Sequence, residues 1–137
     1  MQVEPYLHFP GTCEEALRFY SGVFGGEITY LGRFGESPMA QEMPPERHRE
    51  VMHATFRAPG VSLMASDGRE GAVPGDGISL SVATADVDEG REIFERLAEG
   101  GTVAMPYAKQ FWGATFGMLR DRFGVNWMVN AGAGAAR

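Results

Sequence analysis

The sequence predicts an α+β fold built from two copies of a strand, helix, strand, strand, strand module. Two observations carry this prediction. Acid-rich helix starts are each followed by an apolar stripe at helical spacing, and glycine pairs at residues 25–26 and 100–101 end the two helices. Short strand-like runs surround both helices. We expect modules at about 1–67 and 76–131 that form a single domain over residues 1–137.

In the first module, residues 3–9 alternate as a strand and a helix begins at about Thr12. Thr12 and Glu15 have the spacing of a capping box, in which Thr12 accepts from a backbone N–H and Glu15 reaches back. The apolar face of this helix comprises Cys13, Ala16, Leu17, Tyr20, Val23 and Phe24. Strands are expected near 27–33, 50–57 and 61–66.

In the second module, a strand at about 77–84 leads to a second acid-capped helix start at Asp86. The apolar stripe of this helix comprises Ile93, Phe94, Leu97 and Ala98. Strands are expected near 102–105, 113–120 and 125–130. The last two flank a turn at 121–124, which Asp121 caps through its side chain. Residues 111–127 carry so much aromatic surface that we expect it to be buried or to line a pocket.

Three segments read as irregular. Residues 67–76 are rich in glycine and form the predicted linker between the modules. Residues 35–49 contain three prolines and several charges, so we expect a mobile flap or a disordered excursion there, with His48 solvated. The end of the chain, 131–137, consists mostly of small residues and is expected to fray.

Charge and composition narrow the class of partner. Twelve Lys and Arg against 18 Asp and Glu give a net charge of −6, which disfavours nucleic acid and anionic membrane surfaces. No run approaches the roughly 18 apolar residues of a membrane span, and residues 1–5 lack a signal-like pattern, so we expect a cytoplasmic protein. Cys13 is the only cysteine, which excludes an intramolecular disulfide; a helix start could lower its thiol pKa, but a small buried cysteine is the commoner case.

A set of short segments, in order, covers nearly the whole chain. They are Tyr6-Leu7-His8-Phe9, Glu15-Ala16-Leu17, Phe19-Tyr20, Val23-Phe24-Gly25-Gly26, Met52-His53-Ala54, Ser66-Asp67, Ile78-Ser79-Leu80-Ser81, 97–101 and the closing 112–127. Together they resemble the PhnB-like branch of the glyoxalase / bleomycin-resistance / extradiol-dioxygenase (vicinal oxygen chelate) superfamily. The resemblance implies paired modules in a curved eight-stranded mixed sheet, helices on its convex face, a pocket on its concave face, and a homodimer.

The same resemblance bears on metal binding. In metal-using members, His, Gln or Glu ligands project from the first and last strands of each module. The matching positions here are near Glu4 or Tyr6, then Met64, about Gly77, and Met128. Because thioethers and glycine do not replace imidazole or carboxylate, we expect no bound metal and no other cofactor.

Seven residues form the predicted ligand-binding set: Tyr6, His8, His53, Met64, Trp112, Phe116 and Met128. Tyr6 and His8 share a strand face, where they serve as a hydrogen-bonding pair or general base, or else are polar residues satisfied within the sheet. Trp112 and Phe116 form an aromatic wall for a flat ligand or fill the core between sheet and helix. Trp127 belongs to the opposite, helix-packed face.

The preferred function is therefore a metal-free, small-molecule-binding dimer. The alternative is a metal-dependent lyase, isomerase or dioxygenase that uses His8 or His53 with Glu4 at a displaced site. A structural or regulatory dimer without a ligand is the third hypothesis. Relatives of this branch have carried a quinone-methyltransferase label, but the sequence has no glycine-rich strand-to-helix turn for S-adenosylmethionine.

Overall fold

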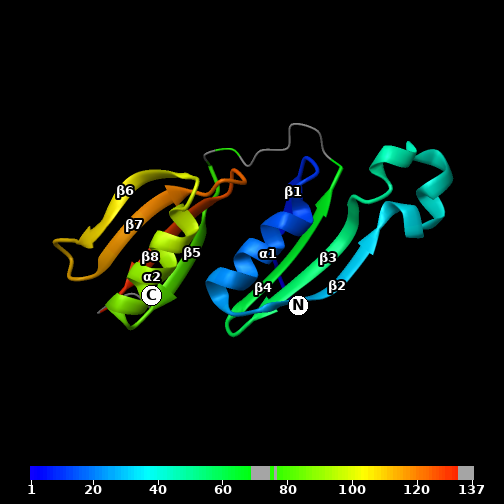
Figure 1. The fold of residues 1–137 in the computed structure, drawn as a ribbon. Coiled ribbons are helices and arrows are strands. Elements are labelled where there is room, and N and C mark those ends of the chain that lie inside the picture. The colour runs from blue at the N-terminus through cyan, green and yellow to red at the C-terminus, as the bar shows by residue number, and fades with distance from the viewer. Residues whose placement is uncertain (69–74, 76, 133–137) are drawn as a thin grey trace. The chain divides into compact units, whose positions relative to one another are not determined.

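A computed structural model describes residues 1–68, 75 and 77–132 of the chain. Its elements in order are β1 (Tyr6–Phe9), α1 (Cys13–Phe24), β2 (Glu27–Arg33), β3 (Val51–Ala58), β4 (Val61–Asp67), β5 (Leu80–Thr84), α2 (Val87–Ala98), β6 (Thr102–Lys109), β7 (Thr115–Arg120) and β8 (Asn126–Ala131) (Figure 1). This is the predicted order of two strand, helix, strand, strand, strand modules. The α+β fold class is confirmed.

The strands form two four-stranded sheets, with orders β1-β4-β3-β2 and β5-β8-β7-β6. In each sheet the first strand pairs parallel with the last, and the remaining pairs are antiparallel. The chain divides into two compact units, Met1–Val73 and Pro74–Arg137, which we call the N-terminal and C-terminal units. Most of the predicted 67–76 linker, and residues 133–137 of the predicted tail, lie outside the described residues.

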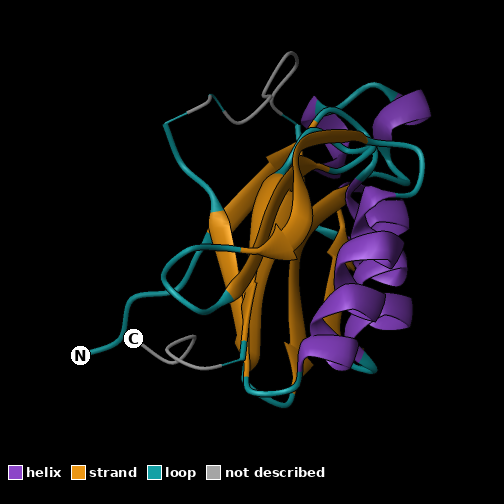
Figure 2. Ribbon diagram, turned by 90° about the vertical axis from the view of Figure 1, so that its left-hand side faces the viewer, coloured by secondary structure: helices purple, strands orange, loops and turns teal. Residues whose placement is uncertain are grey.

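The core of the N-terminal unit lies between α1 and one face of its sheet. Figure 2 shows the helices in purple beside the strands in orange. Leu17 and Tyr20 of α1 are fully buried, as are the sheet residues Phe56 and Ala65. Strand alternation therefore places every second residue toward the helix and the intervening residues on the opposite face. We call that opposite face the N-terminal open face.

The core of the C-terminal unit repeats this arrangement. Gly117 faces α2 so closely that a Cβ there would lie 2.7 Å from Cε2 of Phe94. Trp127 and Val129 are buried on the same side of the sheet. The prediction that Trp127 belongs to the core is confirmed, and the residues that alternate with it lie on the C-terminal open face.

The two helices begin by different means. Asp86 caps α2 as predicted, since its side chain accepts from the backbone N–H groups of Asp88 and Glu89. Thr12 precedes α1 but makes no side-chain cap, so the predicted capping box is wrong. Asp67, at the end of β4, takes this role: its Oδ1 accepts from the backbone N–H of Gly11 at 3.0 Å and of Cys13 at 2.8 Å.

The segment between β2 and β3 is structured, contrary to the expectation of a flap or disordered excursion. Three short 3-10 helices, Phe34–Glu36, Pro38–Glu42 and Pro45–Arg47, occupy it. His48 is half-buried, and its Nε2 lies 2.7 Å from the carbonyl oxygen of Ala40 and 3.1 Å from that of Met43. Prolines that read as breakers instead start successive 3-10 turns, because their fixed φ suits a first helical position. Within the described residues, no helix combines the length and apolar character needed to span a membrane.

Candidate ligand-binding faces

The N-terminal open face carries four of the seven predicted site residues. Tyr6 and His8 of β1 alternate with buried Leu7 and Phe9. Tyr6 pairs in register with Met64 of β4, and His8 pairs with Ser66. His53 comes from β3, on the far side of β4. Strand alternation and sheet order thus bring residues that are 45 or more positions apart in sequence onto one surface.

Tyr6 is the centre of this surface. Its hydroxyl is hydrogen-bonded to His53 Nδ1 at 3.0 Å, and the two rings stack with centroids 5.6 Å apart. The His8 ring lies 4.9 Å from the Tyr6 ring, and its Nδ1 is 3.4 Å from Ser66 Oγ. Tyr6 keeps 37% of its surface exposed. The face therefore offers one phenol and two imidazoles, which both donate and accept hydrogen bonds, beside the half-buried Met64 thioether.

Two side chains extend the N-terminal open face beyond the predicted set. Tyr30 of the edge strand β2 is 53% exposed, and its ring lies 6.0 Å from that of His53. Arg57 follows His53 by four positions on β3 and so shares its face, where it pairs with Glu4 at 3.7 Å. Both were missed because their positions depend on how β2 and β3 pair, although the alternation within β3 was a usable signal for Arg57.

The C-terminal open face carries Phe116 and Met128. These residues alternate with buried Gly117, Trp127 and Val129, and Met128 pairs in register with Met118. Met118 is not in the predicted set, although it lies two residues from Phe116 on the same strand. Trp112 lies in the loop before β7, with its ring 6.1 Å from the Phe116 ring in an edge-on arrangement. An aromatic edge and two thioethers thus share this face.

The aromatic residues of the β6–β7 loop lie outside the core, which was one of two alternatives for Trp112. Trp112 is 53% exposed, and Phe111 is 98% exposed. Both lie at a tight turn closed by the hydrogen bond from Gly113 N to Gln110 O, with Gly113 at a φ of 101°. Because Trp112 is exposed, the interpretation that it fills the core is wrong.

In the described part of the chain, no group of three or more His, Cys, Asp or Glu side chains converges. The alternative function uses Glu4 as the carboxylate ligand of a displaced metal site. Glu4 accepts a short hydrogen bond from Ser62 Oγ and also faces the Arg57 guanidinium. Gly77, the third family position, precedes β5 rather than lying within it. That the protein is metal-free stays a prediction.

Cys13 is fully buried at the start of α1. Its burial, together with the neighbouring charges of Asp67 and Glu14, raises the pKa of the thiol far above its usual value. This is the opposite of the lowering that a helix start alone suggested, because desolvation outweighs the helix dipole. A buried thiol with a raised pKa is a poor nucleophile.

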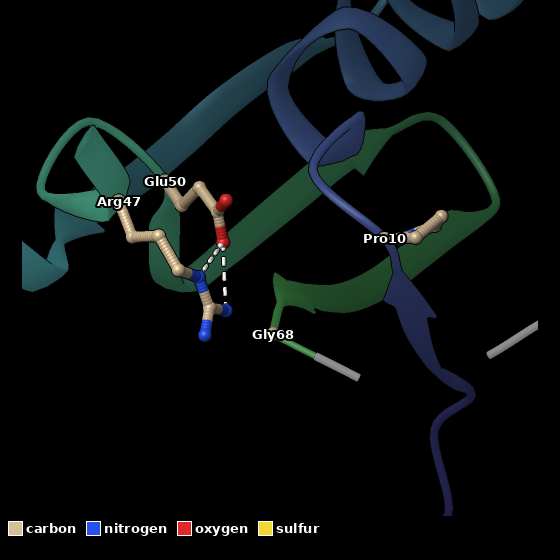
Figure 3. A pocket seen from close by; sticks show the side chains of 4 residues that line it. All are labelled: Pro10, Arg47, Glu50 and Gly68. Carbon is tan, nitrogen blue, oxygen red and sulfur yellow. Dashed lines mark hydrogen bonds and ion pairs between the residues drawn. The ribbon is translucent and has the colours of Figure 1, made fainter. Parts of the chain in front are cut away.

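Two described cavities lie away from the predicted residues. One, of about 300 Å³, is lined by Pro10, Arg47, Glu50 and Gly68 (Figure 3). Arg47 Nε and NH2 both donate to Glu50 Oε1 there, at 3.1 and 2.9 Å. The other, of about 540 Å³, lies along α1 and β2 between Glu14, Ile28, Leu31 and Arg33. Neither includes a residue of the predicted ligand-binding set.

Comparisons with known proteins agree with this architecture. A crystal structure of a protein from Pseudomonas aeruginosa is 41% identical with a TM-score of 0.82, covering 96% of this chain and 98% of its own. A Bacillus cereus structure described as a putative 3-demethylubiquinone-9 3-methyltransferase, PhnB protein, is 29% identical with a TM-score of 0.82, covering 96% and 99%. A family model described as 3-demethylubiquinone-9 3-methyltransferase matches residues 1–130. The chain belongs to this PhnB-like family.

Two further comparisons extend the similarity of the PhnB-like chain to another sequence relative and to a more distant structure. Protein YjdN of Escherichia coli is 33% identical over 139 residues, or 95% of each chain. A fosfomycin resistance protein from Listeria monocytogenes is 14% identical with a TM-score of 0.65, covering 97% of this chain and 93% of its own. At that identity the likeness shows the fold alone. The PhnB-like chain therefore shares its fold with that resistance protein.

Proposed function

We propose that this PhnB-like protein is a small-molecule-binding homodimer that holds a neutral, partly aromatic ligand on its open sheet faces without a metal. The carrying observation is the Tyr6–His53 hydrogen bond on the N-terminal open face, where Tyr6 remains partly exposed beside His8. A small number of placed polar groups beside aromatic side chains is typical of an organic-ligand site. The thioethers and aromatic edge of the C-terminal open face supply further apolar and aromatic contact surface for such a ligand.

The starts of α1 and α2 do not favour the methyltransferase activity that the family description names. A turn that binds the anionic groups of a nucleotide cofactor offers free backbone N–H groups at a helix start. Here the amides of Gly11 and Cys13 donate to Asp67, and those at the start of α2 donate to Asp86. Carboxylates already occupy both helix starts, so neither supports binding of S-adenosylmethionine.

The metal-dependent lyase, isomerase or dioxygenase remains the alternative. It needs a carboxylate near His8 or His53, and Glu4 is already engaged with Ser62 and Arg57. Elemental analysis of protein purified without chelator distinguishes the two functions. Our proposal expects no stoichiometric divalent metal. About one Zn, Mn, Fe or Ni per chain, lost with activity in His8→Ala, would establish the alternative.

Binding is tested by thermal-shift screening of neutral aromatic compounds and phosphorylated metabolites, followed by titration. The proposal expects stabilisation by compounds of the first class. Trp112→Ala should weaken their binding more than it lowers the melting temperature, because Trp112 lies outside the core. Phe123→Ala, which alters an aromatic residue in the β7–β8 turn, is the matched control and should leave affinity unchanged. Stabilisation by phosphorylated metabolites alone would contradict the proposal.

The homodimer is proposed because each four-stranded sheet ends in unpaired edge strands, which relatives of this superfamily are expected to cover with a second chain. Exposed Phe111 is a further apolar surface of the kind that association buries. Light scattering at micromolar concentration should give twice the chain mass of 14.9 kDa. A monomer mass that is independent of concentration would refute it. A cytoplasmic location stays a prediction from composition.

A further inference from the structure

The C-terminal open face contains a buried hydrogen-bond acceptor without a protein partner. Asn130 Oδ1 is inaccessible to solvent and has no hydrogen-bond donor within reach among the described residues. Burying an amide oxygen without a donor is unfavourable, so such atoms are rare in native proteins. An atom of this kind therefore needs an explanation.

The position of Asn130 relates this atom to the proposed ligand site. On β8, Asn130 lies two residues beyond Met128 and alternates with buried Val129 and Ala131. It pairs in register with Phe116 of β7 on one side and with Ala83 of β5 on the other. Asn130 thus shares its face with two predicted ligand-binding residues, Phe116 and Met128.

A second asparagine on the same strand, Asn126, has a structural role and serves as a comparison. Asn126 also lies on the C-terminal open face, but its side chain is satisfied by the protein. Its Nδ2 donates to the carbonyl oxygens of Gly75 and Ile78, and its Oδ1 accepts from Arg120 Nε at 3.1 Å. Asn130 Oδ1 has no comparable partner among the described residues, although Asn130 is the same residue type on the same strand face.

We infer that Asn130 Oδ1 is a specificity-determining acceptor that selects ligands carrying an N–H or O–H donor beside an aromatic ring. This inference rests on the proposed function, since it assigns a ligand class to one of the open faces. A donor of this kind pairs the oxygen when the half-buried Asn130 side chain turns Oδ1 toward the ligand, while the ring packs against Phe116 and the Met128 thioether. A methylated analogue of the same shape leaves the oxygen unpaired, and sites that require a donor discriminate strongly against such analogues.

The test uses phenol and anisole, which differ by one methyl group and in the loss of the hydroxyl donor. Both are titrated into the ¹⁵N-labelled full-length protein, with the Trp112 indole resonance as the reporter in wild type and in variants. The wild type should bind phenol about tenfold more tightly than anisole. In Asn130→Leu this preference should disappear, because the new side chain has similar size but no acceptor.

Stability separates a ligand-selecting role from a structural one. Asn130→Leu should keep or raise the melting temperature, since it removes an unpaired buried polar group. The matched control Asn126→Leu breaks three hydrogen bonds and should lower it while leaving the phenol preference intact. Equal binding of phenol and anisole by the wild type would overturn the inference but not the proposed function. Absence of binding by either probe, and by the wider aromatic panel, would overturn both.

Discussion

Asp67 at the end of β4 accepts the backbone N–H of Cys13 at the start of α1, at 2.8 Å and 54 positions away in the sequence. The same carboxylate binds Gly11 N through Oδ1 and Val51 N through Oδ2, at 3.0 and 2.9 Å. One buried side chain therefore joins the β1–α1 turn, the start of β3 and the end of β4. It positions β1, which carries Tyr6 and His8.

Asp67→Asn should lower the free energy of unfolding by about 1–3 kcal/mol. Both carboxylate oxygens accept backbone N–H groups, so an amide must present its NH2 to one of these donors. Asp86→Asn is the matched control, because Asp86 uses only Oδ1 to cap α2 and asparagine caps equally well. Urea unfolding of both variants measures the difference. An equal loss of unfolding free energy in the two variants would show that the second carboxylate oxygen of Asp67 adds no stability beyond that of a helix cap.

Asp67 should also titrate abnormally. Burial, and to a smaller extent Glu50, raises the pKa of this carboxyl above its ordinary value despite three backbone hydrogen bonds. Above about pH 4 and up to the raised pKa, the folded state then binds more protons than the unfolded state. The free energy of unfolding therefore falls as pH rises through this window.

A carboxyl ¹³C titration by NMR tests the direction of this shift. Glu14 is the internal control, because its hydrogen bonds with Arg18 and Arg33 lower its pKa. Its contribution to stability is present above its unfolded pKa and is lost as pH falls through the lowered folded value. Asp67 should titrate above, and Glu14 below, their ordinary values. Shifts in the same direction for the two groups would refute the account.

The Cys13 thiol should resist modification in the native protein. Burial and the adjacent carboxylates raise its pKa, so little thiolate forms at pH 8. Ellman's reagent should react with less than a tenth of the thiol over minutes in buffer, and completely in denaturant. Fast reaction of the folded protein would restore the possibility of a reactive cysteine.

Two glycines near the end of α1 should respond oppositely to alanine. A Cβ at Gly22 meets nothing within 4 Å, so Gly22→Ala should stabilise the helix by about 0.5–1 kcal/mol. At Gly26 a Cβ would lie 2.4 Å from the Arg57 carbonyl oxygen, so Gly26→Ala should cost about 1–3 kcal/mol. Thermal unfolding measures both. A loss of stability in Gly22→Ala would contradict the packing around α1.

The sequence by itself was sufficient for the order of elements and for the faces of the strands. Helix ends depend on local signals such as Asp86 and Gly25, and strand faces follow from alternation, as Trp127 and Met128 show. These features are encoded within a few residues. The family resemblance also rests on short local segments in order, and the family match over residues 1–130 confirmed it.

Tertiary structure decided which distant residues meet. That Asp67, not Thr12, satisfies the amides at the start of α1 depends on the pairing of β1 with β4, and the stacking of His53 on Tyr6 depends on the order β1-β4-β3. The sequence also could not predict the unpaired oxygen of Asn130. Asn126 lies on the same face of the same strand, but its oxygen is paired. Hydrogen-bond satisfaction and desolvation are properties of three-dimensional surroundings, so only the folded chain distinguishes an asparagine whose amide oxygen is paired from one whose amide oxygen is buried and unpaired.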